Sequence, residues 1–227
     1  MTAQNTRAVT AVHEMPTDVI AAQIDAVLQD ITVDAVKIGM LSSVAIIETV
    51  ARGLEDFEGP VVLDPVMVAK SGDHLLRADA VDCLRTSLLP RATLVTPNLP
   101  EAASLLGSEA AADNEEILSQ AKQILSLGCD AVLMKGGHAS GETCNDYLLK
   151  NSGEDLWLSA PRIDTGNTHG TGCTLSAAIA AGLAKQLDLA EAVSQAHDYL
   201  HTAIARSDGL GFGKGHGPVH HFHQTWS

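Results

Sequence analysis

The sequence predicts a three-layer α/β/α fold, in which a mostly parallel sheet carries helices on both faces. Short apolar runs alternate along the chain with longer segments of helical periodicity. The short runs show little internal alternation of apolar and polar residues, as is typical of strands covered on both faces. With 227 residues, of which 45% are hydrophobic and 19% charged, the chain can form one large domain with its own core. We therefore expect residues 1–227 to form a single domain.

Four apolar runs are the expected parallel strands, and a hairpin is expected after them. The four runs are Val33–Gly39, Pro60–Pro65, Ala92–Pro97 and Ala131–Gly136. Two further β-like runs between Tyr147 and Leu158 surround a turn sequence at 151–153 and predict an antiparallel hairpin. The alternation of strands and helices favours parallel pairing of the first four strands.

Five segments have the periodicity of amphipathic or Ala-rich helices. They are Thr17–Gln29, Ser42–Leu54, Asn114–Leu127, Gly172–Gln186 and Leu189–Arg206. The first segment places Ile20, Ile24, Val27 and Leu28 on one face, which we expect to be buried. Gly128 follows the third segment and predicts a left-handed helix end.

Charge and composition exclude several classes of protein. Fourteen basic against 28 acidic residues give a net charge of −14, which repels nucleic acids but still allows a small anionic ligand held by local groups. No apolar run approaches the ~20 residues of a membrane helix, and no signal peptide is apparent. Four cysteines without a Cys-x-x-Cys pair predict reduced thiols and a cytoplasmic protein: Cys83, Cys129, Cys144 and Cys173.

Polar residues gather where the predicted strands end. The first run ends in Lys37–Met40, Asp64 ends the second, Asn98 and Glu101 follow the third, and Lys135 ends the fourth. The carboxyl ends of parallel strands share one rim of the sheet, where ligands bind in open α/β folds. Taken singly, Asp64 and Asn98 fit loop caps at least as well as ligand contacts. Together these residues predict a site on that rim.

A glycine-flanked turn opens the fourth predicted helix. Gly170, Thr171 and Gly172 precede Cys173 there, and backbone N–H groups at a helix N-terminus bind anions. A helix N-terminus also stabilises the thiolate form of a cysteine. The alternatives are glycines that serve only tight packing and an inert, buried thiol. Neither a Walker A loop nor a dinucleotide fingerprint occurs.

A lysine, two acids suited to a metal and an anion-binding helix terminus are the parts of a phosphoryl transferase. The histidines are a weaker signal. His197 and His201 lie four apart on a predicted helix and a His-rich segment ends the chain at 220–223, but exposed or capping histidines are commoner than metal ligands.

Seven segments, in order along the chain, resemble the hydroxymethylpyrimidine/phosphomethylpyrimidine kinases of the ribokinase-like superfamily. They are Thr2–Thr6, Lys37–Leu41, Leu63–Val66, Thr96–Asn98, Lys135–His138, Asn167–Thr174 and Gly217–His223. The resemblance implies ATP-dependent phosphorylation of 4-amino-5-hydroxymethyl-2-methylpyrimidine and then of its monophosphate, in thiamine biosynthesis. It also implies Mg²⁺, a monovalent cation as a further cofactor, and a homodimer.

The same resemblance implies roles for individual residues. Gln4 matches the glutamine that reads the pyrimidine edge, and an amide offers the donor and the acceptor that an aminopyrimidine needs. Met40 and Val66 match apolar walls of that pocket. Cys173 matches the position of the catalytic base, beside the anion hole at Gly170, Thr171 and Gly172. On the nucleotide side the matching residues are Asp64 and Glu101 near Mg²⁺ and the ATP phosphates, Lys135 and Asn98 near ATP, and, more weakly, Lys214.

The chain departs from the family pattern in two places. The family begins about forty residues earlier with a strand, a glycine-rich turn and a helix, the scale of part of a βαβ unit, so we expect the N-terminal strand–helix unit to be missing. Met1 stands where the family often has valine, which indicates a misplaced start codon or a truncated, inactive paralogue. Gly166 stands where relatives often carry lysine. Within the superfamily, a pyridoxal kinase is the alternative activity.

Overall fold

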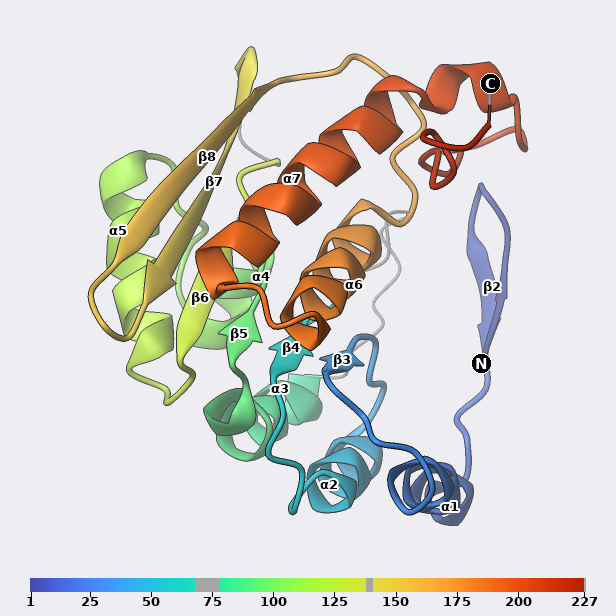
Figure 1. Cartoon of the computed structure of the whole chain (residues 1–227), viewed down its shortest axis with the longest axis vertical. Helices are drawn as coiled ribbons and strands as arrows, with labels where there is room; N and C mark the ends of the chain where they lie inside the picture. Colours follow the sequence, from blue (N-terminus) through green and yellow to red (C-terminus); the bar gives the residue numbers. More distant parts are fainter. Residues whose placement is uncertain (68–77, 138–140, 227) are drawn as a thin grey trace.

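In a computed structural model, which describes residues 1–67, 78–137 and 141–226, a six-stranded sheet lies between two layers of helices (Figure 1). The strand order follows the chain, from β3 at one edge to β8 at the other. Strands β3 to β6 are parallel, and β7 and β8 add an antiparallel hairpin. The predicted fold class is therefore confirmed. The strands are β3 Val36–Ile38, β4 Val61–Leu63, β5 Leu94–Val95, β6 Ala131–Met134, β7 Thr143–Lys150 and β8 Asp155–Pro161.

The helices that connect the parallel strands cover one face of the sheet, and the two that follow the hairpin cover the other. Crossovers of one hand between successive neighbouring strands place their helices on the same face. Helices α3 and α4 are not among the predicted segments; α4, with eight residues, is too short to show a clear period. The first layer holds α2 Val44–Gly53, α3 Ala78–Ser87, α4 Leu99–Leu106 and α5 Asn114–Leu125, with α1 Thr17–Leu28 outside it, and the second holds α6 Thr171–Ala184 and α7 Leu189–Ala205. Two short 3₁₀ helices complete the list, η1 Leu89–Arg91 and η2 Ser207–Leu210.

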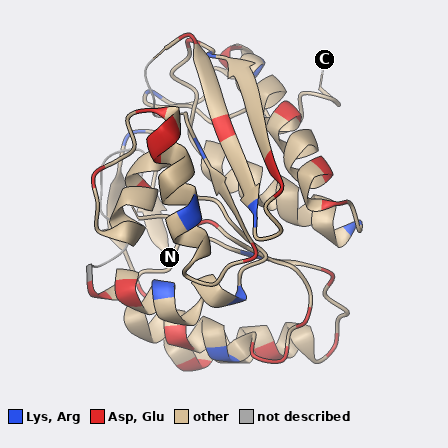
Figure 2. Ribbon diagram, turned by 90° about the vertical axis from the view of Figure 1, so that its left-hand side faces the viewer, with Lys and Arg blue, Asp and Glu red and all other residues tan. Residues whose placement is uncertain are grey.

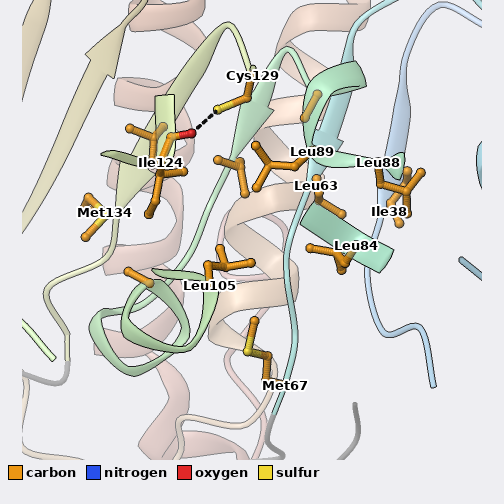
Figure 3. Packing of buried hydrophobic residues seen from close by; sticks show 14 of the residues in the cluster. Ile38, Leu63, Met67, Leu84, Leu88, Leu89, Leu105, Ile124, Cys129 and Met134 are labelled. Atoms are coloured by element: carbon orange, nitrogen blue, oxygen red, sulfur yellow. Dashed lines mark hydrogen bonds between the residues drawn. The ribbon is translucent and has the colours of Figure 1, made fainter. Parts of the chain in front are cut away.

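Two hydrophobic clusters fill the space on the two faces of the sheet. Along β4, Leu63 faces the cluster under α2 to α5, whereas Val62 faces the cluster under α6 and α7. Both side chains are fully buried, which explains why the strands lack polar alternation. Figure 3 shows Leu63 among Leu84, Leu89 and Leu105 in the first cluster. There Cys129 lies beside Ile124, its thiol donating to a backbone carbonyl at 3.7 Å, and burial raises its pKa to about 12.

Helix α1 is less buried than its periodicity predicts. It contains no buried residue, and Val27, expected on the inner face, is 45% exposed. The reason is its position outside α2, at the margin of the helical layer (Figure 1). Between α1 and the edge strand β3 lies a groove of about 360 Å³, lined mainly by apolar side chains such as Ile20, Ile24 and Val50. Lys37 and Gly39 border the same groove.

An N-terminal hairpin stands apart from the main sheet. Strands β1 Thr2–Gln4 and β2 Val9–Val12 pair only with each other among the described strands, and nearly all of their residues are exposed. Its turn contacts the C-terminal loop, because Thr6 Oγ1 accepts hydrogen bonds from the backbone N–H groups of Lys214 (3.3 Å) and Gly215 (3.2 Å). This hairpin is not predicted from the sequence, since it buries no apolar face that would leave a pattern.

The loop after β6 is fixed by a close approach of two backbones. The N–H of Gly136 donates to Asp146 Oδ1 at 2.8 Å, and a Cβ at Gly136 would lie 2.0 Å from the carbonyl oxygen of Asn145. Burial raises the pKa of Asp146, against the opposing effects of that hydrogen bond and of His197 and Lys135. The loop therefore holds the residue before it, Lys135, in one position.

A methyl group at Gly136 is expected to destabilise the fold. Gly136→Ala should lower the free energy of unfolding in urea by about 1–3 kcal/mol, the usual cost of overpacking, because the obstacle is backbone and cannot rotate away. Gly137→Ala is the matched control, since a Cβ there meets nothing within 4 Å; it should stay within about 0.5 kcal/mol of wild type. Equal stabilities of the two variants would contradict the described approach.

The distribution of charged residues and the character of the helices agree with the sequence in the described part of the chain. Figure 2 shows Lys and Arg scattered among Asp and Glu on the helices, a distribution that offers no basic stripe in this view. None of the helices in residues 1–67, 78–137 and 141–226 combines the length and the apolar character needed to cross a bilayer.

Candidate active site

A buried carboxylate and a lysine meet at the carboxyl ends of β4 and β6. Asp64 follows β4 and its side chain is 1% exposed; its Oδ1 accepts hydrogen bonds from Lys135 Nζ at 2.9 Å and Thr96 Oγ1 at 3.2 Å. Ser176 Oγ donates to Oδ2 at 3.3 Å. Lys135 Nζ also lies 3.9 Å from Glu101 Oε2. Lys135 therefore lies between two of the predicted rim residues, the carboxylates of Asp64 and Glu101.

The charges in this cluster influence each other. Burial favours the neutral form of Lys135, but the carboxylates of Asp64 and Glu101 outweigh it and raise the pKa of the lysine above its ordinary value. Burial also raises the pKa of Glu101, only partly offset by the Lys135 ammonium. Lys135 is therefore held as a cation in the site.

The first turn of α6 lies directly over this pair. Gly170 is the N-cap residue, with φ of +81°, which favours glycine. A Cβ at Gly172 would lie 3.2 Å from Lys135 Nζ and 3.7 Å from Asp64 Oδ2, so glycine is what allows the helix terminus to approach. The glycine-flanked turn and the rim residues, predicted separately, thus lie next to each other. Cys173 is exposed in the same turn, so its thiol is not buried, and its reactivity stays a prediction.

Two residues of the site were missed by the sequence analysis. Ser176 is fully buried, and besides Asp64 its hydroxyl contacts the carbonyl oxygens of Gly172 and Cys173, at 3.0 and 3.2 Å. Thr96, also fully buried, reaches Asp64 from β5. The only hint for Ser176 is its spacing of four residues from Gly172 inside an apolar helix, where a hydroxyl needs a partner.

Asn98 has the role of a helix cap. Its side chain accepts the N–H of Glu101 at 2.9 Å, while Glu101 Oε2 accepts the N–H of Asn98 at 2.8 Å. This reciprocal pair is a capping box, so the loop-cap interpretation is confirmed for Asn98, and a contact with the nucleotide stays a prediction. The cap also fixes Glu101 near Lys135.

The remaining predicted residues lie around this centre. Met40 and Val66 are half-buried just beyond the ends of β3 and β4, whereas Gln4 is exposed on the hairpin. Gln4 lines a small polar hollow of about 10 Å³ together with Thr6 and His169, the residue before Gly170. Lys214 lies against the hairpin turn. The pyrimidine pocket and the Lys214 contact therefore stay predictions.

The histidine pairs form no metal site in the described part of the chain. No group of three His, Cys, Asp or Glu residues there could hold an ion. His201 Nε2 instead lies 3.1 Å from the carbonyl oxygen of Pro161, and His223 Nδ1 lies 3.0 Å from that of His220. His138, part of the fourth strand-end motif, lies outside the described residues.

A mostly parallel sheet with a carboxylate–lysine pair beneath a glycine-opened helix defines a ribokinase-like, ATP-dependent small-molecule kinase. The family model for phosphomethylpyrimidine kinase matches residues 1–220. The chain belongs to this family.

Relatives and solved structures agree with this assignment. A hydroxymethylpyrimidine/phosphomethylpyrimidine kinase of Rhizobium meliloti is 54% identical over all 227 residues, which cover 85% of that protein. Phosphomethylpyrimidine kinase from Clostridium difficile is similar with a TM-score of 0.77 and 38% identity, over 89% of this chain and 83% of the other. The structure of an ADP complex of Bacillus subtilis pyridoxal kinase is similar with a TM-score of 0.85 and 36% identity, over 94% of this chain and 79% of the other.

Proposed function

We propose that residues 1–227 act as one kinase domain that transfers the γ-phosphoryl group of ATP to 4-amino-5-hydroxymethyl-2-methylpyrimidine and then to its monophosphate, within thiamine biosynthesis. The observation that carries the proposal is the contact of Asp64 and Lys135 beneath the first turn of α6. Fixed donors and cations at the transferred group are what phosphoryl transfer requires. The choice of substrate rests on the names of the relatives described above.

In the first reaction the alcohol oxygen of the substrate attacks the γ-phosphorus. The bond from that phosphorus to the β–γ bridging oxygen breaks, ADP leaves, and the hydroxyl proton passes to Cys173. The N–H groups at Gly170–Gly172 and the Lys135 ammonium stabilise the charge on the transferred group. In the second reaction a phosphate oxygen of the monophosphate attacks the γ-phosphorus of another ATP and yields the diphosphate and ADP.

The site suits a magnesium ion. Mg²⁺ is held in kinases by one or two carboxylates together with the substrate phosphates, and Asp64 and Glu101 are the two carboxylates that flank Lys135. We propose that these two would hold it. When bound, the ion would neutralise charge on the ATP phosphates. The monovalent cation stays a prediction without an assigned residue.

The less central assignments are proposed on the resemblance alone. Gln4, Met40 and Val66 would bind the pyrimidine, and Asn98 and Lys214 the nucleotide. A cytoplasmic location is proposed because the four cysteines are all unpaired, as expected in a reducing compartment. The homodimer also stays a prediction.

A pyridoxal kinase is the second candidate, because the Bacillus subtilis enzyme is similar over 94% of the chain. Measurement of kcat/KM for the pyrimidine alcohol and for pyridoxal, with the same ATP and magnesium, separates the two. We expect the pyrimidine to be the better substrate by at least tenfold. A preference for pyridoxal would overturn the proposed substrate and leave the kinase class intact.

A further inference from the structure

A second lysine lies beside Asp64, on the side opposite Lys135. Lys37 Nζ is 4.0 Å from Asp64 Oδ2, whereas Lys135 Nζ contacts Oδ1. The strand order β3-β4-β5-β6 places Lys37, on β3, and Lys135, after β6, on the two sides of Asp64. Lys37 pairs in register with Val62, whose side chain belongs to the cluster under α6. The Lys37 side chain therefore points to the face on which the anion-binding helix terminus lies.

The two lysines differ in whether the protein provides a hydrogen-bond acceptor for their ammonium groups. The Lys135 side chain is 13% exposed, and its Nζ donates a hydrogen bond to Asp64 Oδ1 at 2.9 Å. The Lys37 side chain is 22% exposed, and its 4.0 Å separation from Asp64 is too long for a hydrogen bond. Within the described ranges Lys37 Nζ makes no hydrogen bond to another side chain or to the backbone. Its donors are thus available to a ligand.

Gly39 makes room for this ammonium group. Gly39 directly follows β3, and a Cβ at this position would lie 2.5 Å from Lys37 Nζ. The Lys37 side chain therefore runs over Gly39 along the rim, toward the segment that carries Met40. Any side chain at position 39 would displace the ammonium.

The charges of the cluster indicate which ligand group Lys37 would bind. Lys135 Nζ lies within 4 Å of both Asp64 and Glu101, whereas Lys37 Nζ approaches only Asp64, at 4.0 Å, so Lys37 is the cation of the cluster that the protein pairs less closely. The pyrimidine alcohol is neutral, whereas its monophosphate carries about two negative charges near neutral pH. The second acceptor therefore needs a cation that the first does not.

We propose that Lys37 binds the phosphate of the pyrimidine monophosphate and so determines the use of a phosphorylated acceptor in the second reaction. This inference rests on the proposed function. Lys135 lies on the opposite side of Asp64, beside Glu101, and serves the donor nucleotide. One ammonium thus belongs to each of the two phosphates between which the bond forms.

The test is the ratio of kcat/KM for the monophosphate to kcat/KM for the alcohol. Lys37→Met should lower this ratio about 10- to 100-fold, the equivalent of one lost hydrogen bond to a charged group. Lys37→Arg should restore part of it. Gly39→Ala should also lower the ratio, because the added methyl group displaces the Lys37 ammonium without removing it. Lys122→Met is the matched control, an exposed lysine on α5, and should leave the ratio at the wild-type value.

Two results would overturn the inference. A ratio unchanged by Lys37→Met, whether both reactions slow equally or neither does, assigns Lys37 at most a structural role beside Asp64. Calorimetric binding of the monophosphate and the alcohol to wild type and to Lys37→Met gives an answer that needs no turnover. If the wild type turns over neither acceptor, the proposed function fails, while a selective loss of monophosphate binding would still support Lys37. Equal binding by wild type and variant would overturn it.

Discussion

Replacement of Lys135 by methionine is expected to have the largest effect of any single change in the site. Lys135→Met removes the cation that neutralises the transferred phosphoryl group, and kcat should fall at least about 10²- to 10³-fold, as when one preorganised donor is lost. It also leaves Asp64 buried without its ion-pair partner, with Glu101 nearby. Loss of one member of a buried pair costs about 3–5 kcal/mol, which urea unfolding would measure.

The double variant Asp64→Asn/Lys135→Met separates the two effects. It removes both members of the pair, so most of the lost stability should return, because replacing a buried ion pair by neutral groups is often nearly neutral. Activity should not return. If Lys135→Met were as active as wild type while well folded, the assignment of Lys135 to the phosphates would be wrong.

Replacement of Cys173 by alanine is expected to slow turnover by a comparable factor but, unlike Lys135→Met, to leave the stability of the fold almost unchanged. As the base that receives the hydroxyl proton, Cys173 should contribute about 10²- to 10⁴-fold to turnover of the alcohol. The side chain is exposed, so stability should change by no more than about 0.5 kcal/mol. Initial rates with the pyrimidine alcohol at saturating ATP, together with urea unfolding, check both statements.

Two comparisons sharpen the test of Cys173. The reaction of the monophosphate has no alcohol proton to remove, so Cys173→Ala should slow it less than the reaction of the alcohol. Cys173→Ser keeps the size of the side chain and should still be slow, because a serine hydroxyl is a poor base near neutral pH. Near-normal turnover of the alcohol by Cys173→Ala would remove the base role.

The rim of the sheet is predictable from the sequence for a simple reason. Strands β4 and β6 are covered on both faces, so each stands out as an apolar run, and the residues that end them, Asp64 and Lys135, must share one edge. Helix α6 is equally clear, because Gly170 and Gly172 mark its start. These local signals suffice to bring three distant segments to one site.

The residues that pack around and contact Asp64 are not predictable in the same way. Ser176 reaches Asp64 across 112 residues of sequence, and its spacing from Gly172 does not show that its partner is a carboxylate on another strand. The burial of α1 depends on what lies beside it, so its periodicity alone places Val27 wrongly. Lys37 was predicted only as part of a strand-end motif, since its position beside Asp64 depends on the register of β3 against β4.

The most direct measurement of the central claim is phosphorus NMR of the pyrimidine alcohol incubated with the 227-residue chain, ATP and magnesium. We expect the monophosphate signal to appear first and the diphosphate signals to follow as it declines, with ADP formed in both steps. Lys135→Met, in the same mixture, should yield neither product on the same timescale. Absence of both products from a folded wild-type chain would contradict the account and favour an inactive member of the family.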